Sequence, residues 1–148
     1  FKQQLGKVLD LYLALQASLA KDDFQSAKKA GKQLGRKIKE VDMKLLEGEA
    51  HTTWMQTLEL LNKGLGEILG SKDITGVRSG FEPLSIGMAQ AVAGIGVQRK
   101  GPLFELSCPM AFENKGATWL QQDKDVRNPY FGEVMLKCGE VGRQLKGE

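Results

Sequence analysis

Residues 24–45 read FQSAKKAGKQLGRKIKEVDMKL, and the spacing of the apolar and small residues in this stretch sets the fold class. These residues recur at alternating steps of three and four, which places them on one face of a helix, while Lys, Gln, Arg and Glu fill most positions between them. The stripe comprises Phe24, Ala27, Gly31, Leu34, Ile38, Val41 and Leu45. The stretch therefore predicts an amphipathic helix over 24–45, capped at its start by Asp22 or Asp23.

Three other segments show the same helical period. Apolar residues at steps of three and four predict helices over 3–20, 48–69 and 74–96. The short connection at 21–23 makes the first two helices antiparallel neighbours. Because Pro83 lies inside the fourth segment, we expect a kink or a fresh helix start there. The sequence thus predicts a mainly α fold whose residues 1–98 form an up-down four-helix bundle.

Residues 99–148 differ in texture from the bundle. The stretch 103–108 is short and partly alternating, and 139–145 has a similar character, so each predicts a strand. Turn signals lie between them at 114–116 and 128–132. We expect an irregular C-terminal segment with a short two-stranded β ribbon, packed on the bundle within one domain of residues 1–148.

Composition excludes several classes of protein. With 148 residues, 41% apolar and 26% charged, the chain is an ordinary globular domain rather than a disordered one. No apolar run is long enough to insert into a membrane. The net charge of +3 and a basic run over 28–39 without interleaved aromatic residues argue against nucleic acid as a partner. A single histidine, His51, and the lack of a phosphate-binding loop predict that the protein is not an enzyme.

Both cysteines lie in the C-terminal segment, and each has a methionine close by. Cys108 and Met110 would point the same way in extended chain, and Met135 and Cys138 would share a face of a helical turn. If the two segments meet, their sulfurs form a pocket suited to Cu(I), because thiolate and thioether donors are soft. Zn²⁺ makes little use of thioethers and comes second. His51 falls on the stripe of the third helix and is expected to be a packed side chain rather than a ligand.

A structural disulfide between Cys108 and Cys138 is the alternative. Such a bridge would staple the excursion between the cysteines and stabilise the fold by about 3 to 4 kcal/mol if unstrained. The methionines would then be ordinary fillers of gaps in the core. Spacing alone leaves both interpretations open.

Three stretches resemble a known family: CPMAFENKGATWL at 108–120, RNPYFG at 127–132 and MLKCGEV at 135–141. They are similar to those of small exported bacterial proteins classed as a domain of unknown function. That domain also occurs at the C-terminal end of some CusB/HlyD-type periplasmic adaptor proteins of heavy-metal efflux systems. Residues that look like the family's signature in its fourth helix are Arg78, Phe81, Leu84 and Ser85.

The resemblance implies an exported, periplasmic helical domain that is accessory to copper or silver handling. It implies a metal ion, Cu(I) ahead of Ag(I) or zinc, and efflux-system proteins as partners. Carried over to this chain, the metal ligands would be Cys108, Met110, Met135 and Cys138. Many relatives have a histidine directly before the first cysteine, where this chain has Ser107. Any ligand supplied by that imidazole is therefore missing here.

Overall fold

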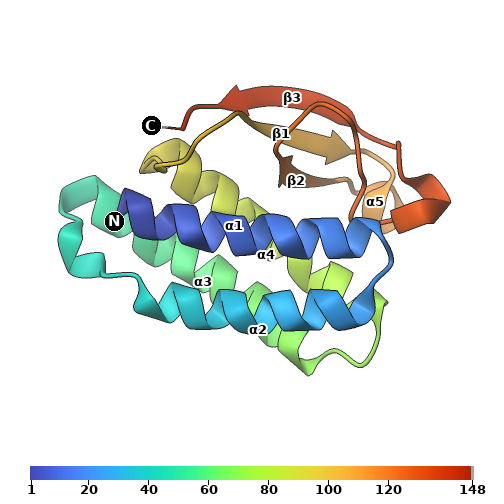
Figure 1. Cartoon of the computed structure of the whole chain (residues 1–148), viewed down its shortest axis with the longest axis horizontal. Coiled ribbons are helices and arrows are strands. Elements are labelled where there is room, and N and C mark those ends of the chain that lie inside the picture. The colour runs from blue at the N-terminus through green and yellow to red at the C-terminus, as the bar shows by residue number, and fades with distance from the viewer. Residues whose placement is uncertain (148) are drawn as a thin grey trace.

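The structure is a computed structural model that describes residues 1–147. Its N-terminal part forms four helices, α1 (Lys2–Ala20), α2 (Phe24–Glu40), α3 (Gly48–Gly70) and α4 (Ile74–Gly94). The helix α1 packs on α2 and α3 packs on α4, while a sheet lies over α1 and α4 (Figure 1). The predicted mainly α bundle followed by a β-containing segment is confirmed. Within residues 1–147, no helix combines the length and the apolar character needed to cross a bilayer.

The second helix ends before its apolar stripe does. The carboxylate of Asp23 caps its start by accepting a hydrogen bond from the N–H of Ser26 at 3.0 Å, as expected. The helix ends at Glu40, and Asp42 begins a separate 3₁₀ turn, η1 (Met43–Leu45). The side chain at the end of that turn, Leu45, is 59% exposed. The prediction of one helix over 24–45 is therefore wrong for 41–45, because the helix ends at Glu40 and Asp42 caps a separate turn.

The fourth helix continues through its proline. Asp73 caps its start, and α4 is uninterrupted from Ile74 to Gly94 with Pro83 inside it. Of the two outcomes expected at Pro83, a kink or a fresh start, the fresh start does not occur. Phe81 and Leu84 are fully buried on either side of the proline. Their burial in the core offsets the hydrogen bond that the proline cannot donate.

Small residues let α3 and α4 touch backbone to backbone. A Cβ added at Gly80 would lie 2.5 Å from the carbonyl oxygen of Gly64 and 2.8 Å from Cγ1 of Ile68. Real side chains do not approach so closely, so this crossing requires glycine at position 80. The close approach brings α4 into the position from which it supports the sheet.

The C-terminal segment contains a three-stranded antiparallel sheet in the order β2-β1-β3. The strands β1 (Leu103–Cys108) and β3 (Glu140–Leu145) coincide with the two that the sequence predicts. The strand β2 (Ala117–Gln121) is a finding of the structure. Its residues are buried at four of five positions, because helices cover one face and the chain at Gly139 passes close to Trp119 on this strand. A strand buried on both faces lacks the alternation that marks a strand in sequence.

The connection from β1 to β2 has an unusual backbone. The short element α5 (Ala111–Asn114) in Figure 1 contains left-handed residues, with φ of 53° at Phe112, 56° at Glu113 and 68° at Asn114. This conformation costs an L residue roughly 1–2 kcal/mol. The chain is therefore strained at residues 112–114, within the connection that follows Cys108.

The α3–α4 crossing gives the first testable prediction. Gly80→Ala should lower the free energy of unfolding by about 1–3 kcal/mol, because its Cβ has no room. Gly66→Ala on α3 is the control, since a Cβ there meets nothing within 4 Å. That variant should gain about 0.5–1 kcal/mol from the lower entropy of its unfolded chain. Urea unfolding measures both, and a Gly80→Ala protein as stable as the wild type would contradict the crossing.

Candidate functional site

The two cysteines lie side by side in the folded chain. The Sγ atoms of Cys108 and Cys138 are 3.3 Å apart, and both cysteines are free thiols. Cys108 is fully buried, whereas Cys138 is half-buried. Their separation exceeds the roughly 2.05 Å of a disulfide bond and places the two thiols in hydrogen-bond contact. Any chemistry at one of these thiols therefore involves the other.

The register between β1 and β3 explains this approach. Ser107 pairs with Glu140, so the residue that faces Cys108 in the antiparallel ladder is Gly139. Cys138 comes directly before it in the chain. A Cβ at Gly139 would lie 2.8 Å from Cη2 of Trp119, so the glycine lets the backbone pass close to β2. Strand pairing therefore delivers one thiol to the end of the strand that carries the other.

A buried side chain, that of Asn128, fixes the segment before the second cysteine. Its Nδ2 donates to the carbonyl oxygen of Cys138 at 2.7 Å. Its Oδ1 accepts from the N–H of Tyr130 at 2.8 Å and from that of Phe131 at 3.1 Å. Its own backbone N–H donates to the carbonyl oxygen of Leu136 at 2.8 Å. One fully buried asparagine thus closes the irregular loop that carries the thiol.

An arginine from α4 attaches the same loop to the bundle. The Nε of Arg78 donates to the carbonyl oxygen of Pro129 at 2.8 Å. Its Nη2 donates to the carbonyl oxygen of Leu19 at 2.9 Å and to Oδ1 of Asp22 at 2.7 Å. The other carboxylate oxygen of Asp22 accepts from the N–H of Glu133 at 2.9 Å. The hydrogen bonds from Arg78 and Glu133 hold the pKa of Asp22 below its usual range.

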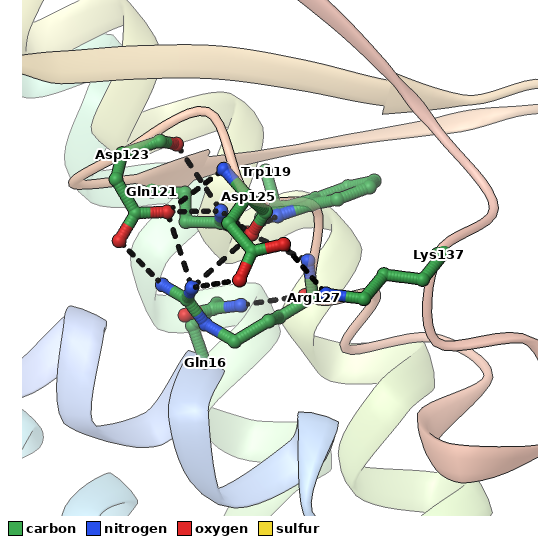
Figure 2. Close-up of polar contacts among 7 residues, drawn as sticks. All are labelled: Gln16, Trp119, Gln121, Asp123, Asp125, Arg127 and Lys137. Atoms are coloured by element: carbon green, nitrogen blue, oxygen red, sulfur yellow. Dashed lines mark hydrogen bonds and ion pairs between the residues drawn. The ribbon is translucent and has the colours of Figure 1, made fainter.

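A second buried amide, that of Gln121, shapes the adjoining loop (Figure 2). Its Oε1 accepts from Nε1 of Trp119 and from the N–H of Arg127, each at 3.1 Å. Its Nε2 donates to the carbonyl oxygen of Asp125 at 2.6 Å. The carboxylate of Asp125 accepts from Nζ of Lys137 at 2.6 Å, which ties this loop to the segment that ends in the second thiol.

The methionines stand outside the buried part of the site. The strand β1 ends at Cys108, and Met110 has helical backbone with φ −89° and ψ −11°, so the extended geometry expected for this pair is absent. The side chain of Met110 is 47% exposed. Met135 ends η2 (Gly132–Met135) and is half-buried. The N–H of Cys138 donates to its carbonyl oxygen at 3.0 Å, which closes a 3₁₀-type turn between the two residues.

The surroundings of Cys138 shift the pKa of its thiol. The hydrogen bond with Cys108, and then burial, raise the pKa of the Cys138 thiol. A surface pocket of about 530 Å³ opens beside Cys108 and includes the carboxylates of Glu82 and Glu140 and the ammonium group of Lys115. Within residues 1–147, no group of three or more His, Cys, Asp and Glu side chains is arranged to hold a metal. The chemistry available at the pair is therefore that of two adjacent thiols.

The sequence patterns do not identify the positioning roles of Asn128 and Gln121. The turn at 128–132 is predicted. In a known turn motif, an asparagine that precedes a proline accepts hydrogen bonds on its side chain from N–H groups further along the chain. That motif is the signal that points to Asn128. Gln121 has no comparable local signal, because its role depends on strand β2. His51 is half-buried near the start of α3.

The Asn128 clamp leads to a stability prediction. Asn128→Ala should lower the free energy of unfolding by about 3 kcal/mol or more, because the carbonyl of Cys138 and two N–H groups lose their partner and each unpaired buried group costs about 1–3 kcal/mol. Asn62→Ala, at an exposed position of α3, is the control and should change stability by less than about 0.5 kcal/mol. Equal stability of the two variants would contradict the clamp.

The lowered pKa of Asp22 leads to a prediction about pH. A carboxyl group whose pKa is lower in the folded state stabilises the fold above its unfolded pKa, and the contribution disappears as the pH falls through the folded value. Asp22→Asn keeps the left-handed backbone at φ 58° accessible but removes the charge. It should lose up to about 1 kcal/mol at pH 7, and the difference from the wild type should vanish near pH 2, as measured by urea unfolding. A difference that persists at low pH would assign the effect to shape rather than charge.

Comparison with known proteins places the helical part of the chain in a family. Residues 8–100, more than half of the chain, match the family model described as "Protein of unknown function (DUF3347)". The match begins within α1, runs through α4 and stops before β1, so the two cysteines lie beyond it. No curated protein and no solved structure matches the chain. The expected kinship with a domain of unknown function is confirmed, and the chain belongs to the DUF3347 family.

Proposed function

We propose that this protein is a non-enzymatic module that binds a soft metal ion, Cu(I), through the thiolates of Cys108 and Cys138. The observation that carries the proposal is the 3.3 Å separation of two free thiols that come from distant parts of the sequence. The buried clamp at Asn128 and the strand register hold that separation. A reduced pair held so firmly is ready to receive a single ion.

The geometry of the pair supports a bridging ion. With metal–sulfur bonds of about 2.3 Å, the length found for zinc, two thiolates at a tetrahedral angle lie about 3.8 Å apart. The two sulfurs at 3.3 Å need to separate by only about half an ångström to reach this distance. Because Cys138 is half-buried, an arriving ion meets it first, and Cys108 completes the bond from inside.

The donor set favours Cu(I) over zinc. A structural zinc site has four ligands, usually thiolates and imidazoles. Within residues 1–147, no histidine, carboxylate or further cysteine joins these two cysteines in an arrangement that could hold a metal. The remaining soft donors close in sequence are the thioethers of Met110 and Met135, which ions such as Cu(I) and Ag(I) accept. Met135 is the better placed, since it lies one 3₁₀ turn before Cys138.

The cellular setting that we propose rests on the resemblance of the C-terminal stretches. It is the periplasm or another exported location, in the service of copper or silver handling beside efflux-system proteins. Binding there would depend on pH, because a metal displaces the thiol protons. The raised pKa of the Cys138 thiol means that a metal competes with a proton that is held more tightly than on an ordinary thiol.

The alternative function is a protein-interaction module stapled by a Cys108–Cys138 disulfide and free of metal. The 3.3 Å separation also favours this chemistry, since the sulfurs need only approach each other to bond. Two thiols would lose two electrons and two protons to an external oxidant, such as the disulfide of a thiol oxidoreductase, and exported compartments are oxidising. A free-thiol count on protein purified without reductant separates the two functions. No free thiols and no metal would support the staple.

Titration of reduced protein with Cu(I) against a chromophoric chelator tests the metal site. We expect one ion per chain, and Cys108→Ser or Cys138→Ser should weaken binding by more than about 100-fold, because each removes a direct ligand. Met135→Leu should weaken binding by about tenfold if its thioether completes the site. Met55→Leu replaces a methionine that is 43% exposed on α3 and serves as the matched control without effect. Unchanged affinity in Cys108→Ser would overturn the proposal.

A further inference from the structure

Arg99 holds two buried hydrogen-bond donors without partners. It lies in the connection between α4 and β1, which passes the end of the molecule where α1 begins (Figure 1). Its Nη2 donates to Oε1 of Gln122 at 3.3 Å. Its Nε and Nη1 are buried, and no atom of residues 1–147 accepts a hydrogen bond from them. Unpaired donors of a buried cation are costly, so their presence calls for an acceptor from outside residues 1–147.

A polar pocket of about 360 Å³ lies at this arginine. One wall is a face of α1, and the other is the connection that carries Arg99. Gly6 makes this arrangement possible, because a Cβ there would lie 2.5 Å from the carbonyl oxygen of Gln98. The N–H of Gln98 donates to the carbonyl oxygen of Lys2 at 3.1 Å, which holds the two walls together. The remaining lining residues are Gln3, Lys7, Asp10 and Lys100.

The charge around the pocket is positive. Lys7 and Lys100 stand with Arg99 against a single carboxylate, that of Asp10, so the lining carries a formal charge of +2. A guanidinium group presents planar N–H donors that match the oxygens of a phosphate or carboxylate two at a time. Lysine ammonium groups add attraction without directional demands.

We infer that this pocket binds a small oxyanion, a phosphate or carboxylate group, on the guanidinium of Arg99. The site is separate from the thiol pair and does not depend on metal binding. Arg99 is partly exposed and its aliphatic stem lies against Gly147, whose Cβ position would be 2.9 Å from Cγ of the arginine. Because Nε and Nη1 are buried in the free protein, binding requires the guanidinium to turn toward the anion.

Titration of the full chain with sodium phosphate, and separately with sodium acetate, tests this inference at constant ionic strength maintained with sodium chloride. The arginine Nε–Hε signals in ¹⁵N NMR spectra report binding at the guanidinium itself. We expect a saturable shift of the Arg99 signal with at least one of the anions. Saturation with phosphate alone would identify a phosphate-type ligand, and saturation with acetate would identify a carboxylate.

Three variants define the site. Lys100→Gln is an exposed change that should weaken binding several-fold without disturbing the fold. Arg99→Gln, followed through backbone signals of residues 98–100, should weaken it by about tenfold or more, because it removes the bidentate donor. Lys63→Gln removes an exposed charge from α3, away from the pocket, and should leave binding unchanged. The inference is overturned if neither anion gives a saturable shift, or if Lys100→Gln and Arg99→Gln bind as tightly as the wild type.

Discussion

The hydrogen bonds of one buried amide, that of Asn128, hold the thiol pair together. Cys138 follows a loop with little regular structure. Without restraints this loop would have high conformational entropy, and the Cys138 sulfur would occupy many positions. The Asn128 side chain binds the carbonyl of Cys138 and the two N–H groups at 130 and 131, so both ends of the loop move as one unit. Strand pairing of Ser107 with Glu140 then orients this unit against the end of β1. Both proposed chemistries of the pair, metal binding and disulfide formation, rest on that restraint.

The bundle acts as the platform for the restrained loop. The hydroxyl of Tyr12 on α1 accepts the N–H of Leu120 on β2 at 3.0 Å and lies 2.7 Å from Oγ of Ser85 on α4, so three elements meet at one oxygen. Burial raises the pKa of Tyr12, which stays a neutral phenol. Phe81 stacks on the Tyr12 ring at 5.0 Å and lies 5.7 Å from that of Tyr130 in the loop. Three of the four α4 residues that resemble the family's signature are thus in contact with the C-terminal segment or with its supports, namely Arg78, Phe81 and Ser85. This gives a physical reason for helix and tail to form one structural unit.

The sequence predicts the helices well because their periodicity is a local property. It overextends α2 because a stripe of apolar residues does not register the cap at Asp42. The sequence does not predict strand β2, because a strand covered on both faces lacks the alternation of polar and apolar residues. The sequence alone cannot predict that the two cysteines meet, because their proximity depends on the register between β1 and β3. The extended backbone expected between Cys108 and Met110 does not occur, because the strand ends at the cysteine and a turn with left-handed residues follows.

The adjacency of the two thiols is the central claim, and a reagent that needs two thiols at once tests it most directly. Phenylarsine oxide condenses with a pair of thiols to form two arsenic–sulfur bonds and one water molecule. Reduced, native protein treated with one equivalent should gain one arsenic per chain and lose both free thiols, Cys108 and Cys138 together, as seen by intact-mass measurement and a thiol assay. Chains that bind the reagent only at denaturing urea concentrations, or that keep both free thiols at one equivalent, would contradict the account.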